Sequence, residues 1–456
     1  MVASHGKTTP YHSRHARCSL HYAGGGLCGH LLDRLRSLAD GDALSSIGSP
    51  GIRYAQPVMA DRLKILHVIP SVSDRHGGPS RAILDIERAL TARGVEVTTV
   101  TTNDDAGSRT LPVQCGEPIA TRNATRWYFP RTTVFFKTSA GMAKWLSENI
   151  ERFDIVHAHG LFSFAPVAAA YLARRAGVPY VLRPLGVLAS YGMTQHHPLL
   201  KKMSLAVIER RLIEAASAIH FTSLAELEET EALGLKCRGV VIPLGIDASR
   251  STSRGGRKWP NGPEPFKLLS VSRIDPKKNL EGLLRALSLV VPKNPGVILS
   301  IAGYGDPEYL ATLQLLACAL EITDHVDWLG YVEGEKKAEV LATATAFVLP
   351  SYSENFGMAV VEALATGLPC IVSREVAISQ EIEAAQAGFV VGTNAESIAA
   401  GIEHLLGNED GYSAMSTAAR ALALNSFSLE AMGERLEALY HDIHIAEGSG
   451  RAALAS

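Results

Sequence analysis

Short, largely apolar runs alternate along the chain with longer segments in which apolar residues recur every three or four positions. The run at 64–69 is followed by a helical pattern at 80–93, which ends at Arg93-Gly94, and then by a second run at 95–100. Runs of this length predict strands, and the segments between them predict helices. Because strands and helices alternate, we expect parallel sheets covered by helices, which is the doubly wound α/β class.

One segment interrupts this alternation and has the composition of a linker. It lies at 249–265 and is rich in Ser, Gly, Arg and Pro. We therefore predict two domains of this α/β class, an N-terminal one at 59–248 and a C-terminal one at 266–426. At 456 residues the chain is long enough for each domain to bury a core. A crevice between two such domains is the expected ligand site.

The first 58 residues do not share this pattern. They hold five of the sixteen His residues and the run Gly24-Gly25-Gly26, with no clear period before Met59. The irregular spacing of His and Cys there predicts a solvated tail rather than a metal site. We expect residues 1–58 to be a disordered or non-native extension, with Met59 as the natural start.

A polar loop separates an apolar run of strand length at 344–349 from a short helical pattern at 358–365. Such a loop lies at the carboxyl end of a strand and the amino end of a helix, where an open α/β sheet places its ligands. The loop contains Glu354, and the helix contains Glu362 eight positions later. Two carboxylates in one crevice suit a ligand rich in hydroxyl groups, such as a sugar and a ribose. A helix dipole also favours both acids, so a structural role stays open.

A pair of cations follows the first strand of the second domain, at 267–272. Arg273 comes directly after it and Lys278 five residues later. Two cations aimed at one place suit a diphosphate, because charge-assisted hydrogen bonds are strong. A solvated surface loop explains the adjacent Lys277 and Lys278 equally well when they are seen alone. These residues alone do not decide which of the three cations binds an anion.

The next strand ends in Gly303-Tyr304-Gly305, which invites a dinucleotide-binding interpretation. The fingerprint G-x-G-x-x-G requires a third glycine at position 308, and that residue is Glu308. The sequence therefore argues against a nicotinamide-dependent dehydrogenase.

Two further groups of residues lie at or just beyond the ends of predicted strands of the first domain. Gly77 and Gly78 precede a helix, and paired glycines let the backbone approach a ligand closely, although a plain tight turn is the commoner explanation. His157 and His159 share one face of a strand that ends at Gly160. We do not expect zinc there, because no third and fourth ligand lie near in the sequence. A structural core histidine is the default for either.

Composition narrows the class of protein. Apolar residues make up 46% and charged residues 20% of the chain, which is typical of a globular protein. The net charge of −2 gives no electrostatic reason to expect nucleic-acid binding. Six Cys without paired spacing fit a reducing compartment. No apolar run reaches the roughly 18 residues of a membrane span. We therefore expect a cytoplasmic protein.

Two stretches of the first domain have the pattern of a membrane-contact face. The stretch at 199–213 is basic and amphipathic, and Phe135, Phe136 and Trp145 lie in another helical stretch. Such faces can lie on an anionic membrane. Packing against the core with a solvated basic side explains the same pattern. Peripheral contact with the cytoplasmic face of a membrane therefore stays open.

The loop Ser353–Gly357, with the sequence SENFG, together with Glu362 resembles the Glu-x7-Glu signature of retaining glycosyltransferases of family 4. The resemblance extends from about Met59 to the end of the chain. It implies the GT-B fold, in which two Rossmann-like domains face each other, and a terminal helix, here at 427–445, that packs back on the N-terminal domain. It also implies transfer of a hexose-type sugar from a nucleotide-diphosphate sugar, without a metal, to a saccharide or lipid-linked saccharide in exopolysaccharide, capsule or lipopolysaccharide synthesis.

The same resemblance implies roles for residues of both domains. Glu354 and His159 are the expected catalytic residues, with Glu354 on the hydroxyls of the donor sugar and His159 orienting the sugar or the leaving group. No covalent nucleophile is expected. The other implied contacts are to the diphosphate (Arg273, Lys278, Gly77, Gly78), to the sugar and ribose (Asn355, Phe356, Gly357, Glu362) and to the base (Gly303, Tyr331, Val332).

The chain departs from the family pattern at one position. Relatives often have Pro-His-Gly where this chain has Leu185 in the middle place, which puts a second histidine of the N-terminal domain in doubt. A catalytically silent protein of the same fold that binds a nucleotide sugar is the alternative function. The presence of all four implied charged residues in the second domain argues against it.

Overall fold

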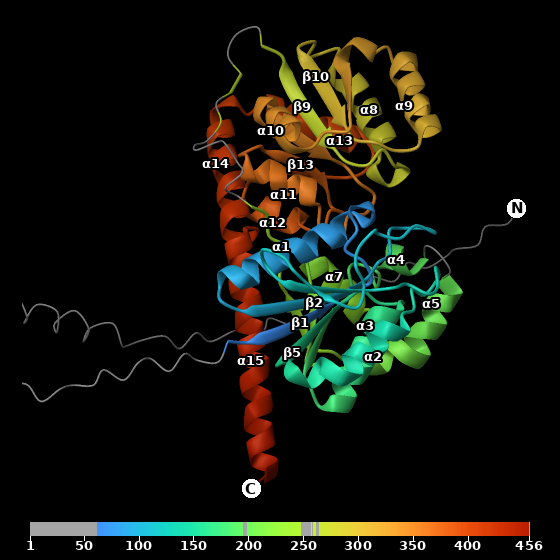
Figure 1. The fold of residues 1–456 in the computed structure, drawn as a ribbon. Helices are drawn as coiled ribbons and strands as arrows, with labels where there is room; N and C mark the ends of the chain where they lie inside the picture. Colours follow the sequence, from blue (N-terminus) through green and yellow to red (C-terminus); the bar gives the residue numbers. More distant parts are fainter. Residues whose placement is uncertain (1–61, 195–197, 248–256, 258, 261–263, 456) are drawn as a thin grey trace, which may run out of the picture. The chain divides into compact units, whose positions relative to one another are not determined.

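Two sheets of mainly parallel strands, each flanked by helices, organise the described part of the chain (Figure 1). The structure is a computed structural model and describes residues 62–194, 198–247, 257, 259–260 and 264–455, without the side chains of residues 190, 191 and 448–455. The predictions for residues 1–58 and for most of the linker at 249–265 lie outside the described residues.

The first sheet has eight strands in the order β3-β4-β2-β1-β5-β6-β7-β8. Neighbouring strands pair in parallel except β3, which runs antiparallel to β4. The strands are β1 (Lys64–Val68), β2 (Glu96–Thr102), β3 (Pro118–Ala120), β4 (Thr125–Phe129), β5 (Ile155–His159), β6 (Tyr180–Arg183), β7 (Ala218–Phe221) and β8 (Gly239–Val241). The helices that accompany this sheet are α1 (Gly78–Ala92), α2 (Ala140–Asn149), α3 (Phe164–Ala176), α4 (Ser190–Thr194), α5 (Pro198–Ser204), α6 (Arg210–Glu214), α7 (Leu224–Glu231) and α15 (Leu429–Ala455), with a π-helical turn at Leu205–Glu209.

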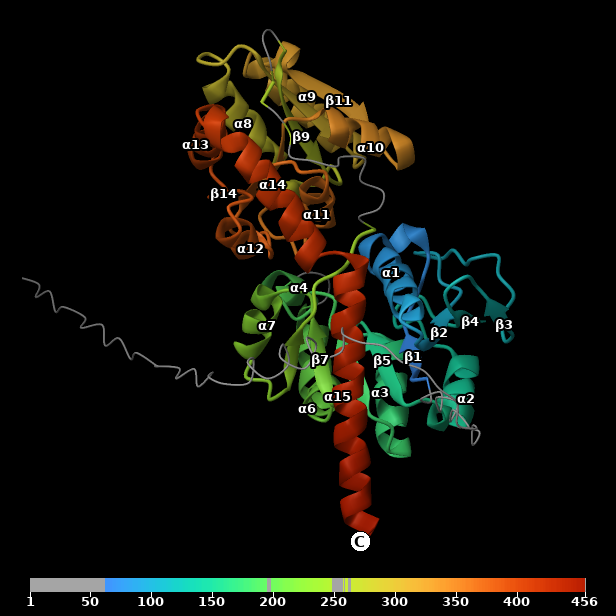
Figure 2. The same ribbon diagram turned by 90° about the vertical axis from the view of Figure 1, so that its left-hand side faces the viewer.

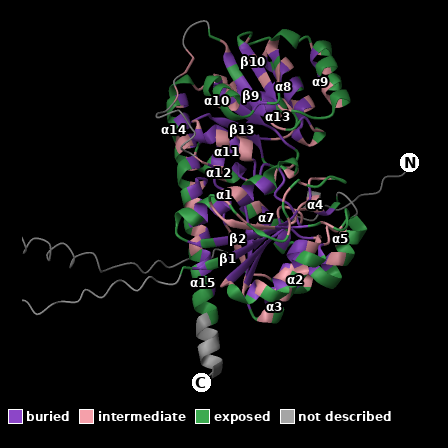
Figure 3. Cartoon of the chain, in the orientation of Figure 1, coloured by how far each residue is buried: buried purple, intermediate pink, exposed green. Residues whose placement is uncertain are grey.

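Side chains that alternate along the central strands divide between two layers of helices. In β1, Ile65 belongs to the core shared with α1 and α15, whereas Leu66 belongs to the core shared with α2 and α3. Successive residues of a strand point to opposite faces, so a strand covered on both faces must be apolar throughout. Figure 2 shows α15 running beside α1, with which it makes many contacts. Figure 3 shows the strands buried between the helices.

The second sheet has six parallel strands in the order β11-β10-β9-β12-β13-β14. The core on one face includes α8, α9 and α13, and the core on the other includes α10, α11 and α14. The strands are β9 (Phe266–Val271), β10 (Val297–Ala302), β11 (Val326–Gly330), β12 (Ala346–Leu349), β13 (Cys370–Ser373) and β14 (Gly388–Val391). The helices are α8 (Leu280–Val290), α9 (Pro307–Ala319), α10 (Gly334–Thr343), α11 (Met358–Ala365), α12 (Ser379–Ala384), α13 (Ala395–Leu406) and α14 (Glu409–Ser426).

The strand order reverses at the middle of each sheet, between β1 and β5 and between β9 and β12. At such a switch point the loops after two neighbouring strands leave toward opposite faces, and the crevice at the carboxyl edge is where open α/β sheets bind ligands. The loops concerned follow Val68 and His159 in the first sheet, and Val271 and Leu349 in the second. The principal predicted site segments therefore lie at the switch points of the two sheets.

These elements confirm the predicted doubly wound α/β class. The helix predicted at 80–93 is α1, which begins at Gly78 because Gly77 is its N-cap, with φ 66° and ψ −125°, and Pro79 fits the first turn. The terminal helix predicted at 427–445 is α15, which continues to Ala455. Among the described residues no helix has the length and apolar character needed to cross a bilayer.

Candidate functional site

The loops after β9 and β12 are fastened to each other at the switch point of the second sheet. Asn279 is buried in a left-handed conformation, with φ 55°, and its side-chain amide donates to the carbonyl oxygen of Pro350 at 3.0 Å. The backbone N–H of Tyr352 donates to the carbonyl oxygen of Lys277 at 2.8 Å. Asparagine adopts this conformation more readily than most residues. The charged side chains of the two loops are thereby held in one place.

Lys278 and Glu354 form an ion pair across these loops. The Lys278 side chain is only 11% and the Glu354 side chain 19% exposed, so water screens their charges little. Burial lowers the pKa of the neighbouring Lys277, an effect that the charge of Glu354 opposes and the charges of Lys278 and Arg273 reinforce. The resemblance favours Arg273 and Lys278, and the charges of both also act on Lys277. The excess of positive charge around one carboxylate suits an anionic ligand.

Glu362 has an ion-pair partner that the sequence did not reveal. Its carboxylate, half-buried on α11, lies 2.5 Å from the ammonium group of Lys337 on α10. A carboxylate in an apolar helix needs a partner, and this pair meets that requirement without a ligand. The contact between Glu362 and a ribose stays a prediction.

At the start of α11 the backbone N–H groups can bind a ligand, whereas the side chains of Asn355 and Phe356 already contact other residues. Gly357 is the N-cap, with φ 88°, and none of the described side chains caps the first N–H groups. Phe356 is buried and packs edge-on against Phe427, with ring centres 5.6 Å apart. The side-chain amide of Asn355 donates to the hydroxyl of Thr222 at 3.4 Å. A helix N-terminus of this kind suits an anionic group, which Phe356 can meet only through its backbone.

The predicted base-site residues follow β10 and β11 of the second sheet. A Cβ on Gly303 would lie 1.7 Å from the carbonyl oxygen of Ser272, so only glycine fits. Tyr331 is 58% exposed and lies edge-on to Tyr304, with ring centres 5.5 Å apart, whereas Val332 is buried. The sequence did not single out Tyr304, because the two tyrosines follow different strands and nothing local joins them.

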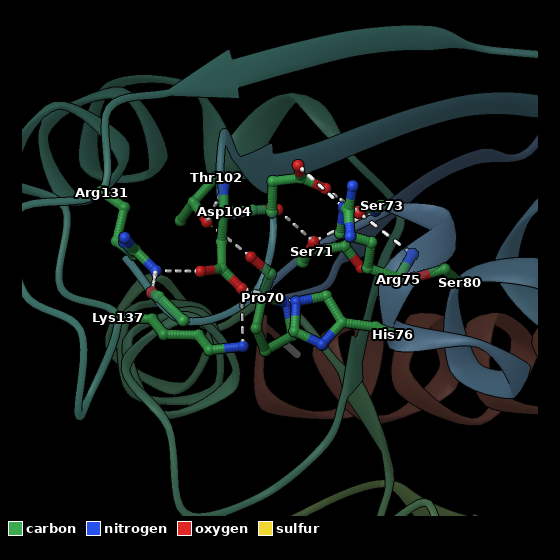
Figure 4. Close-up of polar contacts among 12 residues, drawn as sticks. Pro70, Ser71, Ser73, Arg75, His76, Ser80, Thr102, Asp104, Arg131 and Lys137 are labelled. Atoms are coloured by element: carbon green, nitrogen blue, oxygen red, sulfur yellow. Dashed lines mark hydrogen bonds and ion pairs between the residues drawn. The ribbon is translucent and has the colours of Figure 1, made fainter. Parts of the chain in front are cut away.

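In the first sheet, Gly77 and Gly78 form an exposed turn after β1. A Cβ on either glycine would meet nothing within 4 Å, and Gly77 has φ 66°. The turn therefore leaves room for a ligand close to its backbone. Figure 4 shows the hydroxyl of Ser71, earlier in the same loop, donating to the backbone carbonyl oxygen of Asp104 at 2.7 Å. This bond ties the glycine loop to the segment after β2.

The buried carboxylate of Asp104 joins the glycine turn to two other loops. It pairs with His76 at 2.6 Å, with Lys137 at 2.7 Å and with Arg131 (Figure 4). Burial raises the pKa of Asp104, but the hydrogen bonds and charges of Lys137 and His76 outweigh burial and lower the pKa below its ordinary value. Sequence reasoning missed this network because its members belong to loops after three different strands. An ionised carboxylate thus anchors the turn.

His159, the predicted catalytic histidine, lies at the end of β5 inside a buried polar cluster. Its Nε2 lies 2.8 Å from Nδ1 of His67 on β1, and His157 and His220 are buried beside them. Burial, followed by the charge of Arg183, lowers the pKa of His67 and His220 to about 3. Burial also lowers the pKa of His157 and His159 well below 6.5. All four rings are therefore neutral near pH 7.

Both halves of the chain match glycosyltransferase domains. Residues 77–245 match the glycosyl transferase 4-like domain, and residues 256–422 match the glycosyl transferases group 1. A GDP-mannose-dependent alpha-(1-6)-phosphatidylinositol monomannoside mannosyltransferase of Mycolicibacterium smegmatis is 27% identical over 283 residues, which cover 59% of this chain and 72% of the relative. A phosphatidyl-myo-inositol mannosyltransferase of Mycobacterium tuberculosis is 26% identical over 342 residues, which cover 72% of this chain and 82% of the relative.

Solved structures share the arrangement of the two sheets. Sucrose-phosphate synthase from Thermosynechococcus elongatus aligns with a TM-score of 0.65 and 19% identity, over 84% of this chain and 100% of that one. HepE of Anabaena, in complex with UDP-glucose, aligns with a TM-score of 0.62 and 19% identity, over 85% of this chain and 100% of that one. The matched domains and the shared fold together define a glycosyltransferase with the GT-B fold. The matches of both halves make it a glycosyltransferase of the family 4 type.

The buried histidines predict a loss of stability in acid. Between pH 6.5 and about 3 the unfolded chain binds protons that folded His67 and His220 do not, so the free energy of unfolding falls as the pH falls through this window. Above pH 6.5 both states hold these rings neutral, and the two residues add no pH dependence. Urea denaturation at several pH values from about 7.5 to about 5.5 measures the slope.

The variant His220→Asn removes one of these proton-binding groups from the unfolded chain. We expect a smaller loss of stability per pH unit than in the wild type, whatever the absolute stability of the variant. An unchanged slope would show that His220 is not held neutral in the folded protein.

Proposed function

We propose that this glycosyltransferase is a retaining hexosyltransferase. It moves a hexose from a nucleotide-diphosphate sugar to a saccharide or lipid-linked saccharide in the synthesis of exopolysaccharide, capsule or lipopolysaccharide. The observation that carries the proposal is the ion pair of Lys278 and Glu354 at the switch point, beside Lys277, on which the charges of both and of Arg273 act. Cations suited to a diphosphate stand there beside a carboxylate suited to sugar hydroxyls.

The two chemical halves of the donor meet different groups. The diphosphate accepts hydrogen bonds from Arg273, from Lys278 and from the backbone N–H groups at the start of α11. Each charge-assisted hydrogen bond is worth about 1.5–3 kcal/mol. The Gly77–Gly78 turn of the first sheet lets backbone approach the same group. Glu354 accepts hydrogen bonds from hydroxyls of the sugar, and His159 contacts the sugar from the first sheet.

The nucleoside is assigned to the neighbouring strand ends of the second sheet. Glu362 accepts from the ribose hydroxyls while Lys337 balances its charge. The base lies near Gly303, whose backbone packs too closely on the carbonyl oxygen of Ser272 for any side chain, and beside Tyr331 and Val332. The exposed ring of Tyr331 offers the base an aromatic surface.

At the anomeric carbon the proposed reaction makes one bond and breaks one. The acceptor oxygen bonds to the anomeric carbon on the face from which the diphosphate departs, so the configuration is kept. The bond between that carbon and the phosphate oxygen breaks, and the acceptor proton passes to the departing diphosphate. Arg273, Lys278 and the α11 N-terminus stabilise the negative charge that develops there. With these fixed positive groups, we propose that the transfer is independent of a metal ion.

The names of similar proteins support the choice of first donors and acceptors. The Mycolicibacterium smegmatis relative is named as GDP-mannose-dependent, and HepE structures contain UDP and glucose. The first of these acts on a phosphatidylinositol monomannoside, and another protein of the same fold, WaaG, is described as involved in lipopolysaccharide biosynthesis. GDP-mannose and UDP-glucose are therefore the first donors to test, with lipid-linked and saccharide acceptors.

The ion pair predicts opposite effects of its two partners on nucleotide binding. In calorimetric titrations of the full chain with GDP, UDP and ADP, Lys278→Met weakens binding of the preferred nucleotide by about tenfold to hundredfold, because a charge-assisted hydrogen bond is lost. Glu354→Gln keeps or strengthens that binding, because Lys278 loses a competing carboxylate. It lowers turnover of the nucleotide sugar by about a hundredfold, because the sugar loses a charged acceptor.

Lys293→Met is the matched control, because Lys293 also pairs with a glutamate, Glu403, but at the surface, where its side chain is 72% exposed. It should bind nucleotide as the wild type does. Wild-type affinity in Lys278→Met would place the diphosphate elsewhere. Nucleotide-sugar binding without consumption in the presence of any acceptor class would favour the silent binding protein.

We also propose that α5 and the turn after it touch an anionic membrane surface. Leu199, Met203 and Val207 are 74%, 65% and 65% exposed, although they are apolar. The exposed Lys202 and Arg211 lie among or just beyond them. Apolar side chains bordered by basic ones suit a surface of anionic lipid. Such contact would place the enzyme beside a lipid-linked acceptor.

Flotation with lipid vesicles tests this contact. We expect the full chain to bind vesicles of phosphatidylglycerol and phosphatidylcholine more strongly than vesicles of phosphatidylcholine alone, and Leu199→Glu to weaken the binding. Leu315→Glu on α9 is the matched control, because Leu315 is 71% exposed on the second domain. Equal effects of the two substitutions, or no preference for the anionic vesicles, would refute the α5 surface.

A further inference from the structure

Four histidines and one arginine lie on the strands around the switch point of the first sheet. In register, His67 pairs with His157, and His159 pairs with Arg183. His220 lies on β7, with its ring centre 5.3 Å from that of His157. All five side chains are buried. The proposed function uses His159 alone, so the other three histidines require an explanation.

Half of this cluster is a chain of hydrogen bonds with a fixed direction. A carbonyl oxygen only accepts, so Nε2 of His220, 2.8 Å from the carbonyl oxygen of Ile242, must carry a proton. The neutral ring then has a lone pair at Nδ1, to which Nε2 of His157 donates at 3.4 Å. Nδ1 of His157 in turn accepts from the hydroxyl of Tyr440 at 2.7 Å. Both rings are satisfied, and their role is to join α15 to the sheet.

The other half is incomplete. Nδ1 of His67 and Nε2 of His159 share one hydrogen bond of 2.8 Å. The remaining nitrogens, Nε2 of His67 and Nδ1 of His159, are buried and have no hydrogen-bond partner among the described residues. Because each neutral ring has one N–H and one lone pair, either tautomer of the pair leaves one donor and one acceptor unused. Buried groups of this kind need a partner or a function.

A metal ion does not fit this gap. His67, His157 and His159 can offer nitrogens that lie within 4.8 Å of one another. Both nitrogens of His157 are already engaged, however. Burial is the main cause that lowers the pKa of all three rings, and the charge of Arg183 contributes to each; a metal cation would meet the same repulsion. The unused nitrogens therefore suit a neutral partner with both a donor and an acceptor.

We propose that His67 is a positioning residue for sugar recognition. The hydrogen bond between Nδ1 of His67 and Nε2 of His159 fixes the ring of His159. The other nitrogen of that ring, Nδ1, is then directed toward a hydroxyl of the transferred sugar. A hydroxyl both donates and accepts, so it satisfies Nδ1 in either tautomer of the pair. His159 is the last residue of β5, at the edge where ligands of such sheets bind. This role rests on the proposed function, because it requires a nucleotide sugar as ligand.

Three substitutions of His67 separate positioning from packing. In His67→Asn the amide atoms are bonded to Cγ, as Nδ1 is, so a partner for His159 is kept. In His67→Gln the amide atoms are one bond further from the backbone, near the former position of Nε2, so the atom that bonded His159 is displaced. In His67→Leu no polar atom is left to bond His159. The measured quantity is the ratio of affinities for nucleotide sugar and nucleotide, GDP-mannose against GDP and UDP-glucose against UDP, by calorimetry on the full chain.

We expect His67→Leu and His67→Gln to lower that ratio by about tenfold, which corresponds to one hydrogen bond, and His67→Asn to stay near the wild type. Affinity for the nucleotide alone should not change. His220→Leu is the matched control, a buried neutral histidine of the same cluster that does not touch His159. It should lower the thermal midpoint and leave the ratio unchanged.

The outcomes distinguish this role from the function on which it rests. A wild type that binds neither GDP-mannose nor UDP-glucose overturns the proposed function, and the role of His67 with it. A wild type that binds while His67→Asn and His67→Gln give the same ratio overturns the positioning role alone. A ratio lowered as much by His220→Leu also overturns it, because the effect would then belong to the cluster as a whole. If His67→Leu does not fold, the comparison of Asn with Gln decides.

Discussion

The reversal of strand order in each sheet is the constraint on which the candidate sites depend. Parallel strands bring their carboxyl ends to one edge, and the reversal opens that edge between two loops. Lys278 and Glu354 are 76 residues apart in sequence and meet there in the second sheet. His67 and His159 are 92 residues apart and meet at the equivalent edge of the first. The chemistry of each pair is therefore set by sheet topology, and neither pair could form in a different strand order.

The hydrogen bonds around these edges show how the loops are kept in place. Asn279 fastens the cationic loop of the second sheet to the loop after β12, through the carbonyl oxygen of Pro350. Asp104 does the same for the Gly77–Gly78 turn in the first sheet, by pairing with His76 beside the turn and with the cations Arg131 and Lys137 of the loop after β4. Both anchors are buried, so their bonds compete little with water. The two exposed glycines can then remain open to a ligand without loosening the loop that carries them.

The local part of this arrangement could be predicted from the sequence, and the long-range part could not. Apolar runs suffice to predict the parallel strands, because strands covered on both faces must be apolar. The Glu354 loop is predictable because strand, loop and helix follow one another within a few residues. Lys337, the partner of Glu362, and His67, the partner of His159, belong to other elements of the fold. Only the packing of those elements brings each pair into contact. The packing of Phe356 was likewise not predictable from the sequence, because its ring packs against Phe427, 71 positions away in the sequence.

The two switch points offer different groups to a ligand, and the contrast gives the proposed donor a consistent orientation. The second sheet gathers Arg273, Lys277 and Lys278, which suit the anionic diphosphate. The first sheet holds neutral rings at His67 and His159, whose burial keeps them uncharged near pH 7. A buried neutral imidazole selects its ligand by hydrogen-bond geometry rather than by charge. This suits a sugar hydroxyl, which is itself uncharged. Under the proposed function, the charged edge therefore selects the class of donor, and the neutral edge selects the position of the sugar.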